Sequence, residues 1–151
     1  MMAVAVRQAT SKDATAVFEL IQAHALYERG KASCDVHQLA TLLDQPQPSV
    51  HLLVAVVDRT PVGYASISLD YSLWRCRHWA HLDCLFVTEE HRGAAIGAAL
   101  FDRAREYAEG TGADQMQWQS PQWNVDAARF YRKHGAVQFP KERFVLSLSS
   151  G

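Results

Sequence analysis

Apolar and polar positions alternate along this chain in short, strand-sized stretches. Residues 3–9 (AVAVRQA) predict an opening strand. Residues 50–58 (VHLLVAVVD) and 61–69 (PVGYASISL) flank the turn DRTP, so they predict a β-hairpin. The run HLDCLFV at 81–87 predicts a buried central strand. Two further strands are expected at 114–120 and 143–149, and the aromatic segment 71–79 is expected to be a loop or a strand end.

Four segments carry helical periodicity instead. The first begins at TSKDA (10–14), with Thr10 or Ser11 as its cap, and it places Val17, Leu20, Ile21 and His24 on one face. A short helix is expected at 35–43, before the prolines of 44–48. Further helices are expected at 96–112 and at 124–136, the latter beginning at Asn124 and ending at Gly135. This order predicts one mixed α/β domain spanning residues 1–151.

Composition narrows the class of protein. The chain has 151 residues and a formal net charge of −1, so neither nucleic acid nor an anionic membrane surface is expected as a partner. Its apolar runs are strand-sized and its N-terminus lacks the features of a signal peptide. Three cysteines without a CxxC pair are typical of reduced thiols, which predicts a cytoplasmic protein.

The stretch from His81 to Leu100 carries the first chemical signal. An apolar strand is followed by a short turn with small residues and then by an amphipathic helix. The first N–H groups of a helix have no intrahelical partner, and the helix dipole favours negative charge there. This layout therefore predicts a phosphate-binding turn.

Two motifs in this order resemble the GNAT superfamily of acetyl-CoA-dependent N-acetyltransferases. The first is Arg92-Gly93-Ala94-Ala95-Ile96-Gly97 after a strand, with Ala95 where the family usually has glycine. The second runs from Trp123-Asn124 through Phe130-Tyr131 to Gly135-Ala136. The resemblance implies a central mixed sheet of about six to seven strands flanked by about four helices. The short segments LYE (26–28), HLDCLFV and PQWN (121–124) look most like the diamine and polyamine acetyltransferase branch.

The same resemblance implies roles for particular residues. Backbone groups of Leu85 and Val87 would hold the pantetheine arm of acetyl-CoA. The loop and helix start would hold its pyrophosphate, through Arg92, Gly93, Ala95, Gly97 and Ala98. Asn124 would contact the cofactor arm, and Tyr131 would protonate the leaving thiolate. Asp83 would act as a base, directly or through water, or attract the ammonium of the substrate, and Glu28 would add negative charge at the substrate end.

Each of these residues also has a purely structural alternative. Tyr131 can be a packed helix aromatic, Asn124 is a helix cap in either case, and Glu28 can simply be solvated. Asp83 can form a salt bridge with Arg75 or Arg77. Strand alternation predicts that Asp83 and Cys84 point to opposite faces, so Cys84 would be a buried packing residue if Asp83 faces the site. Ala95 in place of glycine has no effect if the backbone there lies in an ordinary region, and it weakens the turn if the position needs a positive φ. We expect the ordinary region.

Metal ligands are not expected, because His78 and His81 have no carboxylate at ligand spacing. Trp74, Trp79, Trp118 and Trp123 can line a substrate pocket or a subunit interface, and we expect a homodimer. The leading function is transfer of an acetyl group to a primary amine of a small, cationic molecule. The alternatives are a non-catalytic acyl-CoA-binding module and a protein or peptide N-acetyltransferase.

Overall fold

A computed structural model describes residues 3–93 and 95–149 of the chain. Ala94, which belongs to the first motif, therefore lies outside the described residues. The chain divides into two compact units, Met1–Gln119 and Ser120–Gly151.

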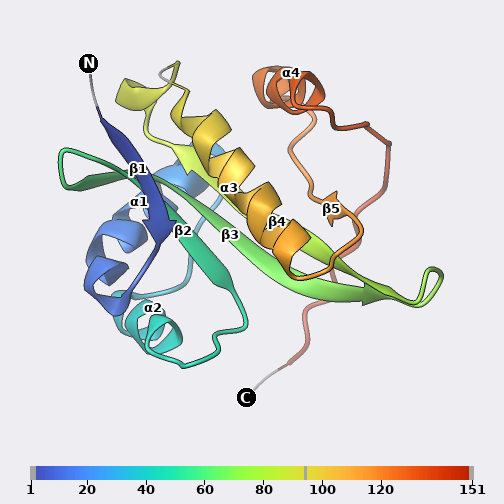
Figure 1. Ribbon diagram of the computed structural model, residues 1–151, viewed down its shortest axis with the longest axis horizontal. Coiled ribbons are helices and arrows are strands. Elements are labelled where there is room, and N and C mark those ends of the chain that lie inside the picture. Colours follow the sequence, from blue (N-terminus) through green and yellow to red (C-terminus); the bar gives the residue numbers. More distant parts are fainter. Residues whose placement is uncertain (1–2, 94, 150–151) are drawn as a thin grey trace. The chain divides into compact units, whose positions relative to one another are not determined.

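The first unit is built on a five-stranded sheet in the order β1-β2-β3-β4-β5 (Figure 1). Its strands are β1 (Val4–Gln8), β2 (His51–Val57), β3 (Thr60–Ser72), β4 (Arg77–Val87) and β5 (Met116–Gln117). The first four pair antiparallel, whereas β5 pairs parallel with β4 after the α3 crossover. A mixed sheet with helical connections is the predicted fold class, and it is confirmed.

Helices cover both faces of this sheet. A short 3-10 turn (Ser11–Asp13) leads into α1 (Ala14–Tyr27), and α2 (Val36–Leu43) follows, with Asp35 as its cap. These helices pack on side chains such as Leu52, Val54 and Tyr64, which point to one face. After a second 3-10 turn (Glu89–His91), α3 (Ile96–Gly110) covers the opposite face (Figure 1). On that face Leu100 of α3 lies beside Gly63.

Gly63 is required on β3 because the backbones approach closely there. A Cβ at this position would lie 2.8 Å from the carbonyl oxygen of Phe86 and 3.1 Å from Cδ1 of Leu100. Real Cβ atoms do not approach a backbone oxygen this closely, so any side chain would push α3 or β4 away. Glycine thus lets α3 seat directly over the middle of the sheet.

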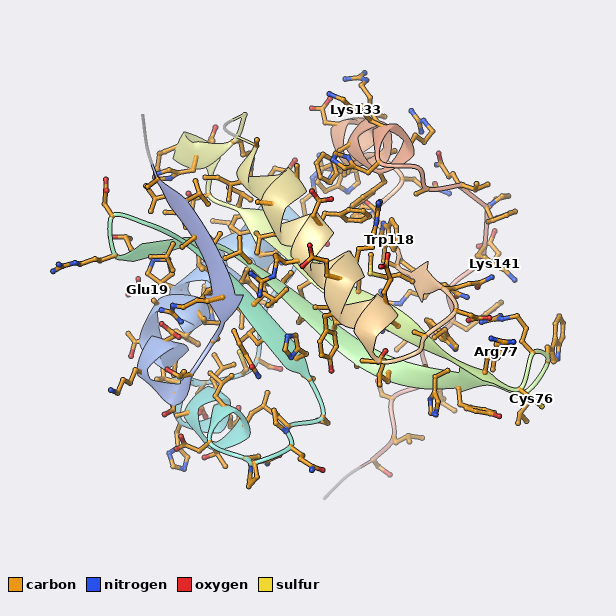
Figure 2. All side chains as sticks on the ribbon, viewed as in Figure 1. Glu19, Cys76, Arg77, Trp118, Lys133 and Lys141 are labelled. Carbon is orange, nitrogen blue, oxygen red and sulfur yellow. The ribbon has the colours of Figure 1, made fainter. Side chains whose placement is uncertain are left out.

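The hairpin between β3 and β4 is longer than expected. The aromatic segment 71–79 contains the end of β3, a tight turn and the start of β4, and Cys76 at the turn has a φ of 50°. Figure 2 shows Cys76 and Arg77 at the tip of this hairpin. Arg75 pairs with Asp114 at 2.9 Å, which ties the tip to the segment that leads into β5.

The second unit contains α4 (Val125–Lys133), and no residue from 134 to 149 has strand structure. The predicted strand at 143–149 is therefore wrong, and the described sheet has five strands instead of six or seven. The apolar side chains of residues 143–149 are exposed, with Phe144 91% and Leu146 85% accessible. A β-prone sequence becomes a strand only when a neighbouring chain segment supplies the ladder of hydrogen bonds.

Candidate functional site

The middle of β4 is interrupted by a β-bulge at Asp83. Ser66 lies opposite Cys84, and Ile67 lies opposite Leu82, so Asp83 has no partner residue on β3. The side chains of Asp83 and Cys84 meet as a result, with Cys84 Sγ 3.6 Å from Asp83 Oδ2. The expectation that they point to opposite faces is wrong, because it assumed unbroken alternation. Within the described chain, no ion pair joins Asp83 to an arginine.

Beyond the bulge, the outer edge of β4 is open. β5 pairs only with Ala80 and His81, and no other described strand continues the ladder on that side. The N–H of Thr88 donates to Val62 on β3, so the alternation of an antiparallel ladder turns the polar groups of Leu85 and Val87 toward the open edge. These two residues were the ones predicted to hold an extended cofactor arm.

The turn after β4 presents backbone N–H groups at the start of α3. Gly93 has a φ of 85°, and Ala95, the N-cap residue, has a φ of 63° and a ψ of 14°. The first helical hydrogen bond is donated by Ala99 to the carbonyl of Ala95, so the N–H groups of residues 96–98 precede the helical ladder. No cap side chain bonds to them. This geometry suits an anionic ligand.

Ala95 stands in the left-handed region, so the expectation of an ordinary backbone there is wrong. The alternative applies: glycine would adopt this conformation without strain, whereas alanine is disfavoured in it. Gly97 and Ala98 occupy the first turn of α3, as predicted.

The Arg92 side chain connects this turn to the end of α1. Its Nε donates to the carbonyl of Val87 at 3.0 Å. Its guanidinium lies 4.4 Å from the ring centre of Tyr27 and 5.3 Å from that of Phe86, in cation–π geometry. The residue predicted to bind phosphate therefore also packs against the aromatic residues beside Glu28.

A polar chain on the α1 face of the sheet links Glu28 to the inside of the sheet. Glu28 Oε2 lies 2.9 Å from Nε2 of His24, and Nδ1 of His24 lies 2.6 Å from the hydroxyl of Tyr64. The Tyr64 phenol in turn interacts with the thiol of Cys84, which contacts Asp83. Glu28 and Asp83, the two carboxylates predicted to attract substrate, thus stand at the two ends of one chain of contacts.

Burial favours the protonated form of two members of this chain, the Tyr64 phenol and the Cys84 thiol. It raises the pKa of the Tyr64 phenol far above its ordinary value and, as the largest effect, also raises the pKa of the Cys84 thiol. A raised pKa lowers the thiolate fraction of Cys84, which makes this thiol a poor nucleophile.

His24 and Tyr64 are further members of this chain of contacts that the sequence alone does not single out. The sequence places His24 on the buried face of α1 and Tyr64 at one position of an alternating strand. The spacing of four residues between His24 and Glu28 was the available signal, because such pairs are neighbours on a helix. The partner on β3 required the register of the sheet.

Asn124 and Tyr131 belong to the second unit. Asn124 is buried, and its Oδ1 accepts a hydrogen bond from the N–H of Ala127 at 3.2 Å, which confirms the predicted cap. Tyr131 lies near the end of α4, half-buried, with its ring 5.5 Å from that of Phe130. Gly135, with a φ of 95°, ends this helix as expected.

The four tryptophans differ in exposure. Trp74 at the hairpin tip is 100% accessible, whereas Trp79 is half-buried near His81. Trp118 packs edge-on against Phe101 of α3 at 5.5 Å, and Trp123 is 38% accessible.

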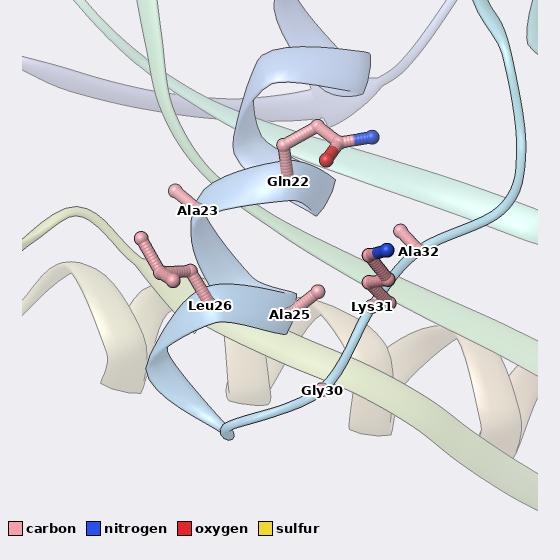
Figure 3. Close-up of a pocket in the computed structure, with 7 residues that line it drawn as sticks. All are labelled: Gln22, Ala23, Ala25, Leu26, Gly30, Lys31 and Ala32. Carbon is pink, nitrogen blue, oxygen red and sulfur yellow. The ribbon is translucent and has the colours of Figure 1, made fainter.

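A surface pocket of about 340 Å³ lies elsewhere, between α1 and the segment after it (Figure 3). It is lined by Gln22, Ala23, Ala25 and Leu26 of α1 and by residues 30–32. None of the predicted site residues lines it. In the part of the chain that the structure describes, no cluster of histidine, cysteine and acidic side chains could hold a metal ion. No helix among residues 3–93 and 95–149 is long and apolar enough to cross a membrane.

Comparison with known proteins identifies the family. The chain is 29% identical to the thialysine N-epsilon-acetyltransferase of Bos taurus, over 90% of this chain and 85% of that protein. It is 30% identical to the aminoalkylphosphonate N-acetyltransferase of Salmonella typhimurium, over 87% and 84% respectively. An aminoglycoside acetyltransferase from an uncultured soil metagenomic sample shares the fold, with a TM-score of 0.80 and 19% identity over 97% of both chains. Residues 15–136 match the family described as the acetyltransferase (GNAT) family, so this chain belongs to that family and is an N-acetyltransferase.

Proposed function

We propose that this enzyme transfers the acetyl group of acetyl-CoA to a primary amine of a small, cationic, diamine-like molecule. The observation that carries the proposal is the position of Glu28 and Asp83 at the two ends of one chain of polar contacts on the α1 face of the sheet. The two units together would form one N-acetyltransferase domain.

The described residues fit acetyl-CoA. The exposed turn at Gly93 and Ala95 and the uncapped N–H groups of residues 96–98 suit a pyrophosphate. The open edge of β4 at Leu85 and Val87 suits an extended amide-bearing arm, which would continue the ladder as a strand does. When bound, acetyl-CoA supplies the thioester whose acetyl group is transferred. Asn124 would contact its arm from the start of α4.

The chain's own residues would manage charge and protons. Asp83 would hold the substrate amine as its ammonium and accept its proton, directly or through water. The neutral amine would then form the new C–N bond as the C–S bond of the thioester breaks, and the nitrogen would release its second proton to water. Tyr131 would donate its phenolic proton to the departing thiolate, because a phenol and an alkyl thiol hold a proton with comparable strength.

Substrate charge follows from the two carboxylates. Asp83 is exposed at the bulge, and the side chain of Glu28 is 39% accessible at the end of α1. A second ammonium on the substrate would be attracted to Glu28. The relatives are named for thialysine and for an aminoalkylphosphonate, which supports an amine acceptor for this chain.

We further propose a cytoplasmic homodimer with two-fold symmetry. Leu73 and Trp74 at the hairpin tip are 80% and 100% accessible, and tryptophan is enriched in interface cores. Sedimentation at micromolar concentration should give a dimer, and Trp74→Ala should shift it toward monomer. A parent species at the chain mass of 16.9 kDa would contradict the dimer.

Kinetics on two variants test the catalytic assignment. Tyr131→Phe should lower kcat by about 10²- to 10⁴-fold with little change in affinity for acetyl-CoA, as for the loss of a general acid. Asp83→Asn should raise KM for a diamine, lower kcat, or both. An undiminished kcat in Tyr131→Phe would remove Tyr131 from the reaction. Acetyl-CoA binding without turnover of any amine would favour the binding module, and turnover of peptides alone would favour a protein acetyltransferase.

A further inference from the structure

His24 is held at three points around its ring. Nδ1 lies 2.6 Å from the Tyr64 hydroxyl and Nε2 lies 2.9 Å from Glu28 Oε2. One face stacks on Phe86, with ring centres 4.9 Å apart and planes 20° from parallel. Only 13% of the side chain is accessible, so its orientation is fixed by packing as well as by hydrogen bonds.

The direction of the hydrogen bonds follows from the donors available. The Glu28 carboxylate only accepts, so Nε2 of His24 must carry the hydrogen of that contact. The buried Tyr64 phenol keeps its proton, because burial raises its pKa. It can therefore donate its hydrogen to Nδ1 of His24, which leaves the ring hydrogen on Nε2, where it faces Glu28.

The Glu28 side chain is otherwise weakly constrained. It projects from the residue that ends α1 and is 39% accessible. A free glutamate at such a position samples several rotamers, and fixing them has an entropic cost when a ligand binds. His24 is anchored through Tyr64 to the middle of the sheet and removes that freedom before the substrate arrives.

We propose that His24 is a positioning residue that holds Glu28 ready for the second ammonium of a diamine and thereby sets the preference for doubly charged substrates. This inference rests on the proposed function, since it assigns a substrate role to Glu28. His24 itself touches neither the amine nor the thioester.

Two amide variants separate the two contacts of the ring. In His24→Asn the side-chain amide takes the place of Nδ1 of the ring, so this variant keeps the contact with Tyr64 and loses the contact with Glu28. The amide of His24→Gln overlies Nε2, so it keeps Glu28. Activity is measured on 1,4-diaminobutane and on butylamine, which lacks the second charge.

His24→Asn should raise KM for the diamine about five- to tenfold, the size expected when a contact to a charged group is loosened, with kcat within about twofold. KM for butylamine should not change, and His24→Gln should restore the diamine KM. Glu28→Gln should raise KM for the diamine by a similar factor. The double variant His24→Asn/Glu28→Gln should raise this KM no further than either single variant. If His24→Asn raised KM equally for both amines, or lowered kcat without changing KM, the proposal would be overturned.

A second measurement does not depend on turnover. In ¹⁵N-edited NMR of the parent, the His24 ring should carry hydrogen on Nε2, and this proton should exchange faster with water in Glu28→Gln. A ring protonated only on Nδ1 would overturn the positioning role. If the ring shows the predicted state but the parent does not prefer the diamine, the proposed substrate class fails and the contact between His24 and Glu28 stands.

Discussion

The backbone of Ala95 gives a prediction whose size can be worked out from its geometry. Its φ of 63° and ψ of 14° lie in the left-handed region, and its side chain is exposed. That conformation costs an L-residue about 1–2 kcal/mol. Glycine adopts it freely but loses about 0.4–1 kcal/mol more on folding, because its unfolded chain is more flexible. Since little packing is lost, Ala95→Gly should stabilise the protein by about 0.5–1 kcal/mol.

Thermal unfolding measures this difference. For a chain of this length, a change of 1 kcal/mol shifts Tm by roughly 2–4 °C, so Ala95→Gly should raise Tm by about 1–4 °C. Gly93→Ala is the matched control two residues away. Its φ is 85° and an added Cβ would meet nothing within 4 Å, so it should lower Tm through the backbone alone. A lower Tm in Ala95→Gly, or a neutral Gly93→Ala, would refute the left-handed assignment of the turn.

Three further changes test other parts of the structure. Gly63→Ala should destabilise by about 1–3 kcal/mol or more in urea unfolding, because its Cβ would lie 2.8 Å from the Phe86 carbonyl; unchanged stability would show that the strands are further apart. Asp13→Asn should lower the free energy of unfolding by about 1–2 kcal/mol at pH 7, because Arg7 donates to both oxygens of the Asp13 carboxylate. The loss is no larger because Arg7 is partly exposed, so solvent screens the ion pair. The Arg7 hydrogen bonds lower the pKa of Asp13 in the folded state. The stabilisation from Asp13 is therefore complete above the unfolded pKa near 3.9 and is lost as pH falls through the folded pKa. If the loss of stability caused by Asp13→Asn were as large at pH 3 as at pH 7 in urea unfolding, this account would be contradicted. Gly97→Asp should abolish most acetyl-CoA binding in calorimetry while the fold survives, because it places a carboxylate at the start of α3, and unchanged affinity would move the cofactor site elsewhere.

Local patterns predicted much of the architecture. The hairpin of β2 and β3, the cap at Asn124 and the helix after the glycine-containing turn all follow from short-range chemistry. The segment 143–149 shows the limit of such patterns. Its alternating apolar residues indicate strand propensity, but a strand also needs a pairing partner, and no local pattern shows whether one is present.

The candidate site was predictable where it depends on sequence-local geometry. The turn at Arg92–Gly97 could be read from small residues after a strand, whereas the left-handed backbone of Ala95 could not, because alanine gives no signal for a positive φ. The bulge at Asp83 and the contact of His24 with Tyr64 depend on the register of β3 and β4. That register is decided by the packing of both sheet faces.

Acetyl transfer to a diamine tests the central claim most directly. The purified protein is mixed with acetyl-CoA and 1,4-diaminobutane, thiol release is followed continuously, and the product is identified by mass spectrometry. The account predicts thiol release in step with formation of N-acetylated diamine, faster than with butylamine at equal concentration. Acetyl-CoA binding without thiol release, for the diamine and for a panel of other small primary amines, would contradict it.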